Sequence, residues 1–190
     1  KIAHDYNTEI GIHVNAQEAY PESKSFCEEM LEKPFAGGWG WLDQSVLIDK
    51  RWDLSSQARY KRFVQLYDRI NGTSFYSEAW PKAVGPSNGT VASKEEIKAD
   101  AANRPDNMDF IYLDVWYQNA WETRQIAKEI NSLGWRFSTE FSAQGEYDST
   151  WQHWSTDAGY GGAGAKGLNS DIIRFLRNDQ RDSQVLNWPS

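Results

Sequence analysis

The stretch from Asn107 to Trp154 carries the clearest hydrophobic pattern in the chain. It opens with an apolar run, Phe110–Leu113, that is short and aromatic enough to predict a buried strand. Apolar-face positions then recur at +3, +4 and +7, which predicts a helix whose face consists of Thr123, Ile126, Ala127, Ile130 and Leu133. Gly134 supplies a left-handed helix stop, and the alternation that follows predicts a second strand over Trp135–Phe141.

Strand, helix and strand joined by short links form a βαβ unit, whose strands are parallel and whose crossover is right-handed. Both strands then end at the same edge of the sheet, where α/β folds place their chemistry. Asp114 closes the first strand and Glu140 lies near the end of the second. The pattern therefore predicts two carboxylates close together at one edge.

Paired carboxylates at such an edge favour glycoside hydrolysis. One carboxylate attacks or stabilises the anomeric carbon, and the other, with a raised pKa, protonates the leaving oxygen. Taken singly, Asp114 and Glu140 are equally compatible with structural roles, as a helix cap or as the partner of an arginine. Their joint placement favours a functional role. Glu146 and Asp148 are rival candidates for the acid.

The N-terminal part of the chain predicts a further strand and helix. Ile10–Asn15 has the pattern of a strand, with His13 and Asn15 on one face near its carboxyl end. Pro21 is well placed to begin a helix that runs through Leu31. The single cysteine, Cys27, falls within this helix, so we expect a small buried apolar residue rather than a catalytic thiol.

A second helix and an irregular segment follow. Ser55 or Ser56 can cap a helix that ends at Asn71-Gly72. The periodicity then breaks over about residues 72–105, which are rich in glycine, proline and serine in their first half, and Ser93 offers a cap for one short helix there. We interpret residues 72–105 as a surface insert.

Composition narrows the choice of function. The length of 190 residues suits one domain, 1–190. A formal charge of −7 with no basic stripe argues against a nucleic-acid partner. The sequence has no apolar run long enough to cross a membrane, no metal-ligand spacing among its three histidines and no cofactor motif. Ten tryptophans offer flat faces that suit stacking against sugar rings, although we expect about half of them to fill the core.

Three segments, FIYLDVW, AKEINSLGWRFSTE and EYDSTWQHW, resemble the catalytic core of the endo-α-N-acetylgalactosaminidases, glycoside hydrolase family 101. The resemblance runs from about Ile12 to Arg181 and weakens over Tyr67–Pro105. It implies a retaining endo-glycosidase on a (β/α)₈ TIM-type barrel that removes Galβ1-3GalNAc from Ser or Thr of mucin-type glycoproteins. By motif, Asp114 resembles the nucleophile and Glu140 the general acid/base.

The same resemblance extends to substrate-binding residues. The glycine-interleaved loop with Trp39 and Trp41 is similar to the family's Trp-x-Trp lid, so both indoles are candidates for stacking on the sugar. The resemblance also implies that His13 contacts a hydroxyl group and that Trp154 forms a wall of the sugar site. Buried indoles that pin the loop, and a packed core histidine, are the structural alternatives for Trp39, Trp41 and His13.

Only three strands are firm, with a fourth near the end, whereas a closed barrel usually needs about 250 residues. We therefore expect a partial barrel of about three to four βα units, which belongs to a longer polypeptide and needs its remaining segments as partners. On its own this piece should be inactive or nearly so. The resemblance implies an extracellular or cell-surface location and an O-glycan as substrate, without a cofactor.

Two other functions stay open at this point. A different retaining α-glycosidase could use the same barrel, because fold does not determine substrate. A non-catalytic, tryptophan-rich carbohydrate-binding fragment would also explain the indoles, but it would not need Asp114 and Glu140 to converge.

Overall fold

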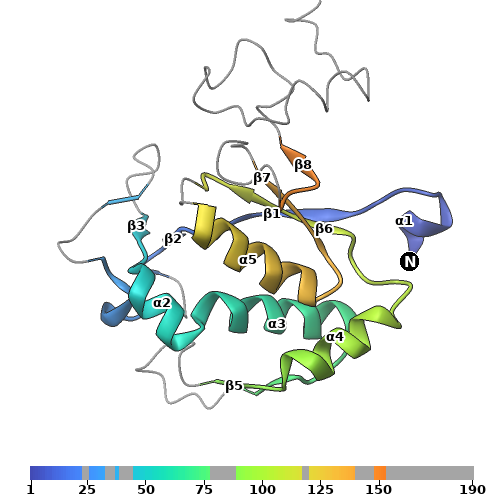
Figure 1. The fold of residues 1–190 in the computed structure, drawn as a ribbon, viewed down its shortest axis with the longest axis horizontal. Helices are drawn as coiled ribbons and strands as arrows, with labels where there is room; N and C mark the ends of the chain where they lie inside the picture. Colours follow the sequence, from blue (N-terminus) through green and yellow to red (C-terminus); the bar gives the residue numbers. More distant parts are fainter. Residues whose placement is uncertain are drawn as a thin grey trace, which may run out of the picture. The chain divides into compact units, whose positions relative to one another are not determined.

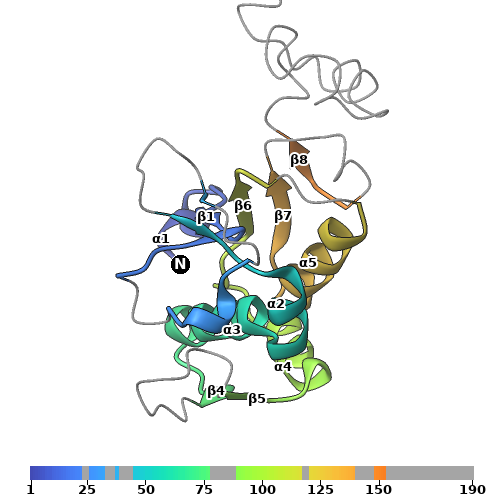
Figure 2. The same ribbon diagram turned by 90° about the vertical axis from the view of Figure 1, so that its left-hand side faces the viewer.

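The structure, a computed structural model, describes residues 1–22, 26–32, 37–38, 45–77, 89–116, 120–139 and 148–152. The chain forms two compact units, whose elements are labelled in Figures 1 and 2. The first unit comprises Lys1–Glu9, Asn15–Met108 and Ser132–Gly134. The second comprises Ile10–Val14, Asp109–Asn131 and Trp135–Ser190.

The second unit contains a four-stranded sheet in the order β1 (Gly11–Asn15), β6 (Phe110–Asp114), β7 (Arg136–Thr139) and β8 (Trp151–Gln152). The pairs β6–β7 and β7–β8 are parallel, which confirms the predicted βαβ unit. The strand β1 runs in the same direction as β6, because the Ile10 carbonyl accepts from Asp109 N at one end and His13 lies beside Asp114 at the other. All four strands therefore end at one edge.

The helix α5 (Ala120–Ser132) lies alongside β6 and β7 in both views (Figures 1 and 2). Its predicted apolar face is confirmed, since every member is buried: Thr123, Ile126, Ala127 and Ile130, with Leu133 just beyond the helix end. Gly134 has φ +76, as predicted for the helix stop. We infer that α5 covers the sheet face formed by the fully buried side chains of Ile111, Leu113, Phe137 and Thr139.

The first unit is built from helices and two short antiparallel strand pairs. The helices are α1 (Ile2–Asp5), α2 (Lys50–Ser56), α3 (Ala58–Asn71), α4 (Lys94–Ala102) and the 3₁₀ turn η1 (Glu28–Met30). The strand β2 (Glu18–Ala19) pairs with β3 (Val46–Leu47), and β4 (Tyr76–Ser77) pairs with β5 (Thr90–Val91). Among the described residues, no helix is long and apolar enough to cross a membrane.

One helix prediction in the first unit was wrong, and a second was wrong only about where the helix starts, because α3 ends at Asn71 with Gly72 as its left-handed C-cap, as predicted. Within Pro21–Leu31, the described residues form only η1, and Cys27 has an extended backbone as its N-cap, although its side chain is buried as expected. The predicted cap at Ser55 or Ser56 lies inside α2, which begins instead after Asp49, whose carboxylate accepts from Trp52 N at 2.7 Å. Gln57, in the left-handed region at φ 56, then separates α2 from α3.

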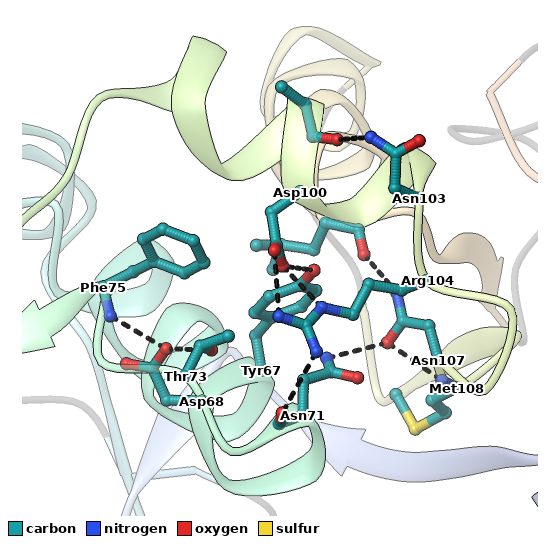
Figure 3. A network of polar contacts seen from close by, with 12 residues as sticks. Tyr67, Asp68, Asn71, Thr73, Phe75, Asp100, Asn103, Arg104, Asn107 and Met108 are labelled. Carbon is teal, nitrogen blue, oxygen red and sulfur yellow. Dashed lines mark hydrogen bonds and ion pairs between the residues drawn. The ribbon is translucent and has the colours of Figure 1, made fainter.

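The segment 72–105 contributes to the core of the first unit through α4, where Ile97 and Ala101 are buried. Ser93 caps this helix, as predicted, by accepting from Glu96 N at 3.2 Å. A polar network then fastens α4 to α3: Tyr67 Oη donates to Asp100 at 2.6 Å, and Arg104 donates to the same carboxylate at 2.7 and 2.9 Å (Figure 3).

Candidate active site

Asp114 stands at the carboxyl end of β6, as the sequence predicts, with 29% of its side chain exposed. A partner comes from the neighbouring strand β1, where His13 Nε2 lies 3.5 Å from Asp114 Oδ1. The imidazole is 64% exposed and stacks on the ring of Tyr112, with centroids 5.2 Å apart and planes 20° apart. The site therefore brings a carboxylate and an imidazole together at an accessible position.

These side chains share the sheet face opposite the apolar layer. Strand alternation puts Tyr112 and Asp114 on the face away from Leu113, and the register adds Ser138 beside Tyr112. The close approach of β1 depends on Gly11, where an added Cβ would lie 2.3 Å from the Phe110 ring. The face thus carries an exposed imidazole and a partly exposed carboxylate, groups that suit a polyhydroxylated ligand, together with a buried phenol and a buried hydroxyl.

The backbone is strained directly after Asp114. Val115 has φ +51, and for a β-branched side chain the left-handed region is a true outlier. Such a residue costs on the order of 1–3 kcal/mol, and strain of this kind concentrates at functional sites, where the surrounding structure enforces it. The position of the outlier, one residue after the candidate nucleophile, supports a functional role for this turn.

Buried polar contacts surround the strained turn. Trp116 is 1% exposed, and its Nε1 donates to Thr123 Oγ1 on α5 at 2.8 Å. On the other side, Thr139 Oγ1 on β7 donates to the Leu113 carbonyl at 3.1 Å. The residues immediately before and shortly after Asp114 are therefore both tied to neighbouring elements.

The other predicted site residues lie outside the described residues: Glu140, Trp39, Trp41 and Trp154. The described residues include Thr139, next to Glu140, and residues at both ends of the loop that carries Trp39 and Trp41. Thr139, which precedes Glu140, pairs with Leu113, which precedes Asp114. Around the tryptophan loop, Gly37 bridges to Val46 and Gly38 N donates to the Ser45 carbonyl at 2.9 Å, so the described ends of this loop are held together.

Of the two rival carboxylates, Asp148 is described and Glu146 is not. Asp148 precedes β8, whereas Asp114 ends β6, and the strands of this sheet run in one direction. Asp148 therefore does not follow a strand at the carboxyl edge. No group of three or more histidine, cysteine, aspartate or glutamate side chains that could hold a metal ion occurs among the residues with described positions.

Sequence reasoning missed three features of the site. Nothing in the sequence marks Val115 as left-handed, and the pairing of β1 with β6 joins segments that are almost a hundred residues apart. The hydroxyls of Thr123 and Thr139 did leave a signal, since each occupies a position on an otherwise apolar face.

An aspartate at the carboxyl edge of a parallel βα sheet, beside an imidazole and a strained turn, is compatible with hydrolytic enzymes of the α/β class, and comparison with known proteins places the chain among the glycoside hydrolases. It belongs to the endo-alpha-N-acetylgalactosaminidase family, glycoside hydrolase family 101, whose profile matches residues 1–189. This confirms the predicted family and extends the resemblance across the weak segment 67–105.

The chain spans only a small part of the length of one curated relative that it matches. A Renibacterium salmoninarum protein, provisionally named as an endo-alpha-N-acetylgalactosaminidase, is 30% identical over 177 residues. The match covers 93% of this chain and 9% of that relative's length.

Proposed function

We propose that this chain supplies the catalytic carboxylates of a retaining endo-glycosidase that releases Galβ1-3GalNAc, α-linked to Ser or Thr of mucin-type O-glycoproteins. The observation that carries the proposal is the register of β6 and β7. Leu113 pairs with Thr139, and each is followed directly by a carboxylate, Asp114 and Glu140. Family membership supports the same two residues, because both stand in the motifs of the resemblance.

The strand spacing supports a retaining mechanism. Neighbouring strands lie about 4.8 Å apart, so carboxylates that follow a pair of residues in register are expected to be separated by a comparable distance. Retaining glycosidases hold their two carboxyl groups about 5–5.5 Å apart, whereas inverting enzymes need about 6.5–9.5 Å to admit a water molecule. A pair drawn from adjacent strands therefore favours retention.

In the proposed reaction, Asp114 attacks the anomeric carbon while Glu140 protonates the Ser or Thr oxygen that leaves. The resulting glycosyl-enzyme has the β configuration. Glu140, now ionised, takes a proton from water, which attacks the same carbon and displaces Asp114, so the disaccharide is released as the α-anomer. Two inversions give net retention.

The position of His13 supports a role in substrate binding. It lies beside Asp114 on an accessible face, so a sugar whose anomeric carbon approaches Asp114 would bring a ring hydroxyl within reach of the imidazole. We propose that His13 binds this hydroxyl and that Trp39, Trp41 and Trp154 stack on the sugar rings. This assignment for the tryptophans comes from the family resemblance.

We propose further that the sheet is one arc of a (β/α)₈ barrel. Four strands in one direction with α5 on one face match three to four βα units, and the opposite face, which carries Asp114, would line the barrel interior. The remaining strands would come from other segments of the polypeptide, and the protein would act outside the cell or at its surface, where mucin-type glycans occur. The isolated chain should then show little or no turnover.

The test is hydrolysis of an aryl α-glycoside of Galβ1-3GalNAc by the full-length polypeptide that carries this chain. We expect release of the intact disaccharide, with a loss of at least about 10³-fold in kcat in Asp114→Asn and a large loss in Glu140→Gln. Asp148→Asn is the matched control, because it changes a carboxylate outside the edge and should keep activity. Cleavage of a monosaccharide α-galactoside in place of the disaccharide glycoside would indicate a different α-glycosidase. Binding of the glycoside without turnover would indicate a non-catalytic carbohydrate-binding fragment.

A further inference from the structure

Two threonine hydroxyls are buried where apolar side chains would be expected. Thr123 lies on the apolar face of α5, and Thr139 lies on the sheet face that this helix covers. Both side chains are fully buried. Burying a hydroxyl in such a layer is unfavourable unless it makes a hydrogen bond, and valine would fill the same volume without this requirement.

Each hydroxyl forms a hydrogen bond with the segment that contains Asp114. Thr139 Oγ1 donates to the carbonyl of Leu113, one residue before Asp114, at 3.1 Å. Thr123 Oγ1 accepts from Nε1 of Trp116, two residues after Asp114, at 2.8 Å. The two hydrogen bonds therefore bracket the candidate nucleophile, one from β7 and one from α5.

The bracketed segment needs such support. Between Leu113 and Trp116 lie only Asp114 and Val115, and Val115 is held at φ +51, a conformation that its β-branched side chain disfavours. With both ends tied, the backbone torsions of Asp114 and Val115 have little freedom. If either tie is removed, the turn can relax toward ordinary β or helical torsions, and the Asp114 carboxylate then rotates with its backbone.

We propose that Thr123 and Thr139 are positioning residues for Asp114: their buried hydroxyls hold the strained turn in the conformation that presents the carboxylate to the anomeric carbon. This inference rests on the proposed function, because it gives Asp114 the role of nucleophile. Neither threonine touches substrate in this account. Both act through the backbone and through the Trp116 indole.

The experiment compares isosteric and conservative variants in the full-length polypeptide, with the aryl α-glycoside of Galβ1-3GalNAc as substrate. Thr123→Val and Thr139→Val remove the hydroxyls and keep the volume, whereas Thr123→Ser and Thr139→Ser keep the hydroxyls. Because misplacing a reacting group by about 1 Å can cost about 10²-fold, we expect each Val variant to lose about 10- to 100-fold in kcat with KM changed less than about threefold. The Ser variants should retain kcat within about threefold.

A second route tests the same hydrogen bond from its donor. Trp116→Phe removes the indole N–H, so its kcat should fall as in Thr123→Val, and the double variant should fall no further, because both changes delete one interaction. Trp116→Phe still tests the positioning role of this hydrogen bond if Thr123→Val fails to fold. Circular dichroism at the assay temperature verifies that each variant compared is folded.

Three results would overturn the inference: Val variants with the parental kcat, Ser variants that lose as much as Val variants, or an additive double variant. Asp114→Asn, assayed alongside, separates this inference from the proposed function. Full activity in Asp114→Asn would refute the proposed function itself. An inactive Asp114→Asn together with fully active Val variants would refute only the positioning role of the two threonines.

Discussion

The network that joins α3 to α4 allows a stability prediction worked from its geometry. Tyr67 is fully buried, and its hydroxyl donates to Asp100 at 2.6 Å (Figure 3). Burial, followed by the hydrogen bond to Asp100, raises the pKa of Tyr67, and the hydrogen bond from Arg104 lowers the pKa of Asp100. The network therefore holds a neutral phenol against an ionised carboxylate. Tyr67→Phe removes the phenol hydroxyl, and with it this hydrogen bond, without creating a large cavity.

The expected cost follows from the exposure of the partner. Hydrogen bonds to charged groups contribute about 1.5–3 kcal/mol. Asp100 keeps its two contacts to Arg104 and is 26% exposed, so water can replace the lost phenol in part. We therefore expect Tyr67→Phe to lower the free energy of unfolding by about 1–2 kcal/mol at pH 7.

The pH dependence has a definite sign. Because the folded-state pKa of Asp100 lies below its unfolded value of about 3.9, its contribution is complete above about pH 5 and is lost as pH falls through the folded-state pKa. Because the pKa of Tyr67 is raised, its contribution is present below its unfolded value of about 10 and is lost as pH rises through the folded-state pKa. The difference between wild type and Tyr67→Phe should thus shrink in acid.

The assay is hydrogen–deuterium exchange of the α3 and α4 peptides in the full-length polypeptide, together with thermal unfolding at pH 7 and in acid. Tyr6→Phe is the control, because Tyr6 is 80% exposed. Exchange in α3 and α4 that is as slow in Tyr67→Phe as in Tyr6→Phe at pH 7 would refute the reasoning. So would a difference that grows in acid.

Two further predictions concern single positions. Gly134→Ala should lower the free energy of unfolding, measured by denaturant titration, by about 1–2 kcal/mol, because Gly134 has φ +76 and a Cβ would lie 3.0 Å from Asn107 Nδ2. Gly72→Ala is the control and should lower it less, because Gly72 has φ +68 but open space around it. An equal loss in the two variants would exclude a steric contribution at Gly134. His13→Ala should lower kcat/KM for the disaccharide glycoside by about tenfold, or about 1.4 kcal/mol, as expected for one lost hydrogen bond to substrate; unchanged steady-state kinetics would exclude His13 from the site.

Local chemistry made part of the fold predictable. The sequence predicted the apolar face of α5, the end of this helix at Gly134 and the apolar strand β6. Helix periodicity and a left-handed glycine depend on residues close in sequence, so a local pattern is enough to predict them. The strand–helix–strand order then placed Asp114 at the carboxyl edge without any knowledge of distant contacts.

Other features depended on long-range contacts or on competing caps. His13 lies beside Asp114 only because β1 pairs with β6, and this pairing depends on contacts between segments that are far apart in the sequence. Gln57 adopts a left-handed conformation that glycine or asparagine would normally signal, so the division between α2 and α3 was hidden. In the described part of this segment the expected helix from Pro21 is replaced by the short turn η1, because a favourable first residue alone does not offset the cost of helix nucleation.

The sequence predicted which residues belong to the candidate site but not how they are arranged in space. Asp114 could be proposed from its place after an apolar run, whereas the strained Val115 and the two threonine contacts arise from packing between α5 and the sheet. Such strain has no local sequence signal, since the surrounding structure enforces it against the preference of the residue.

The most direct test of the central claim is the anomeric configuration of the glycosyl azide formed by nucleophile and acid/base variants in the presence of azide, read by NMR. If Asp114 is the nucleophile of a retaining enzyme, Asp114→Gly with azide should give the β-azide, because azide displaces the leaving group once, from the face that Asp114 occupied. Glu140→Ala should give the α-azide through the glycosyl-enzyme. An α-azide from Asp114→Gly, or an Asp114→Gly variant that hydrolyses the substrate at the parental rate without azide, would contradict the assignment of Asp114 as nucleophile.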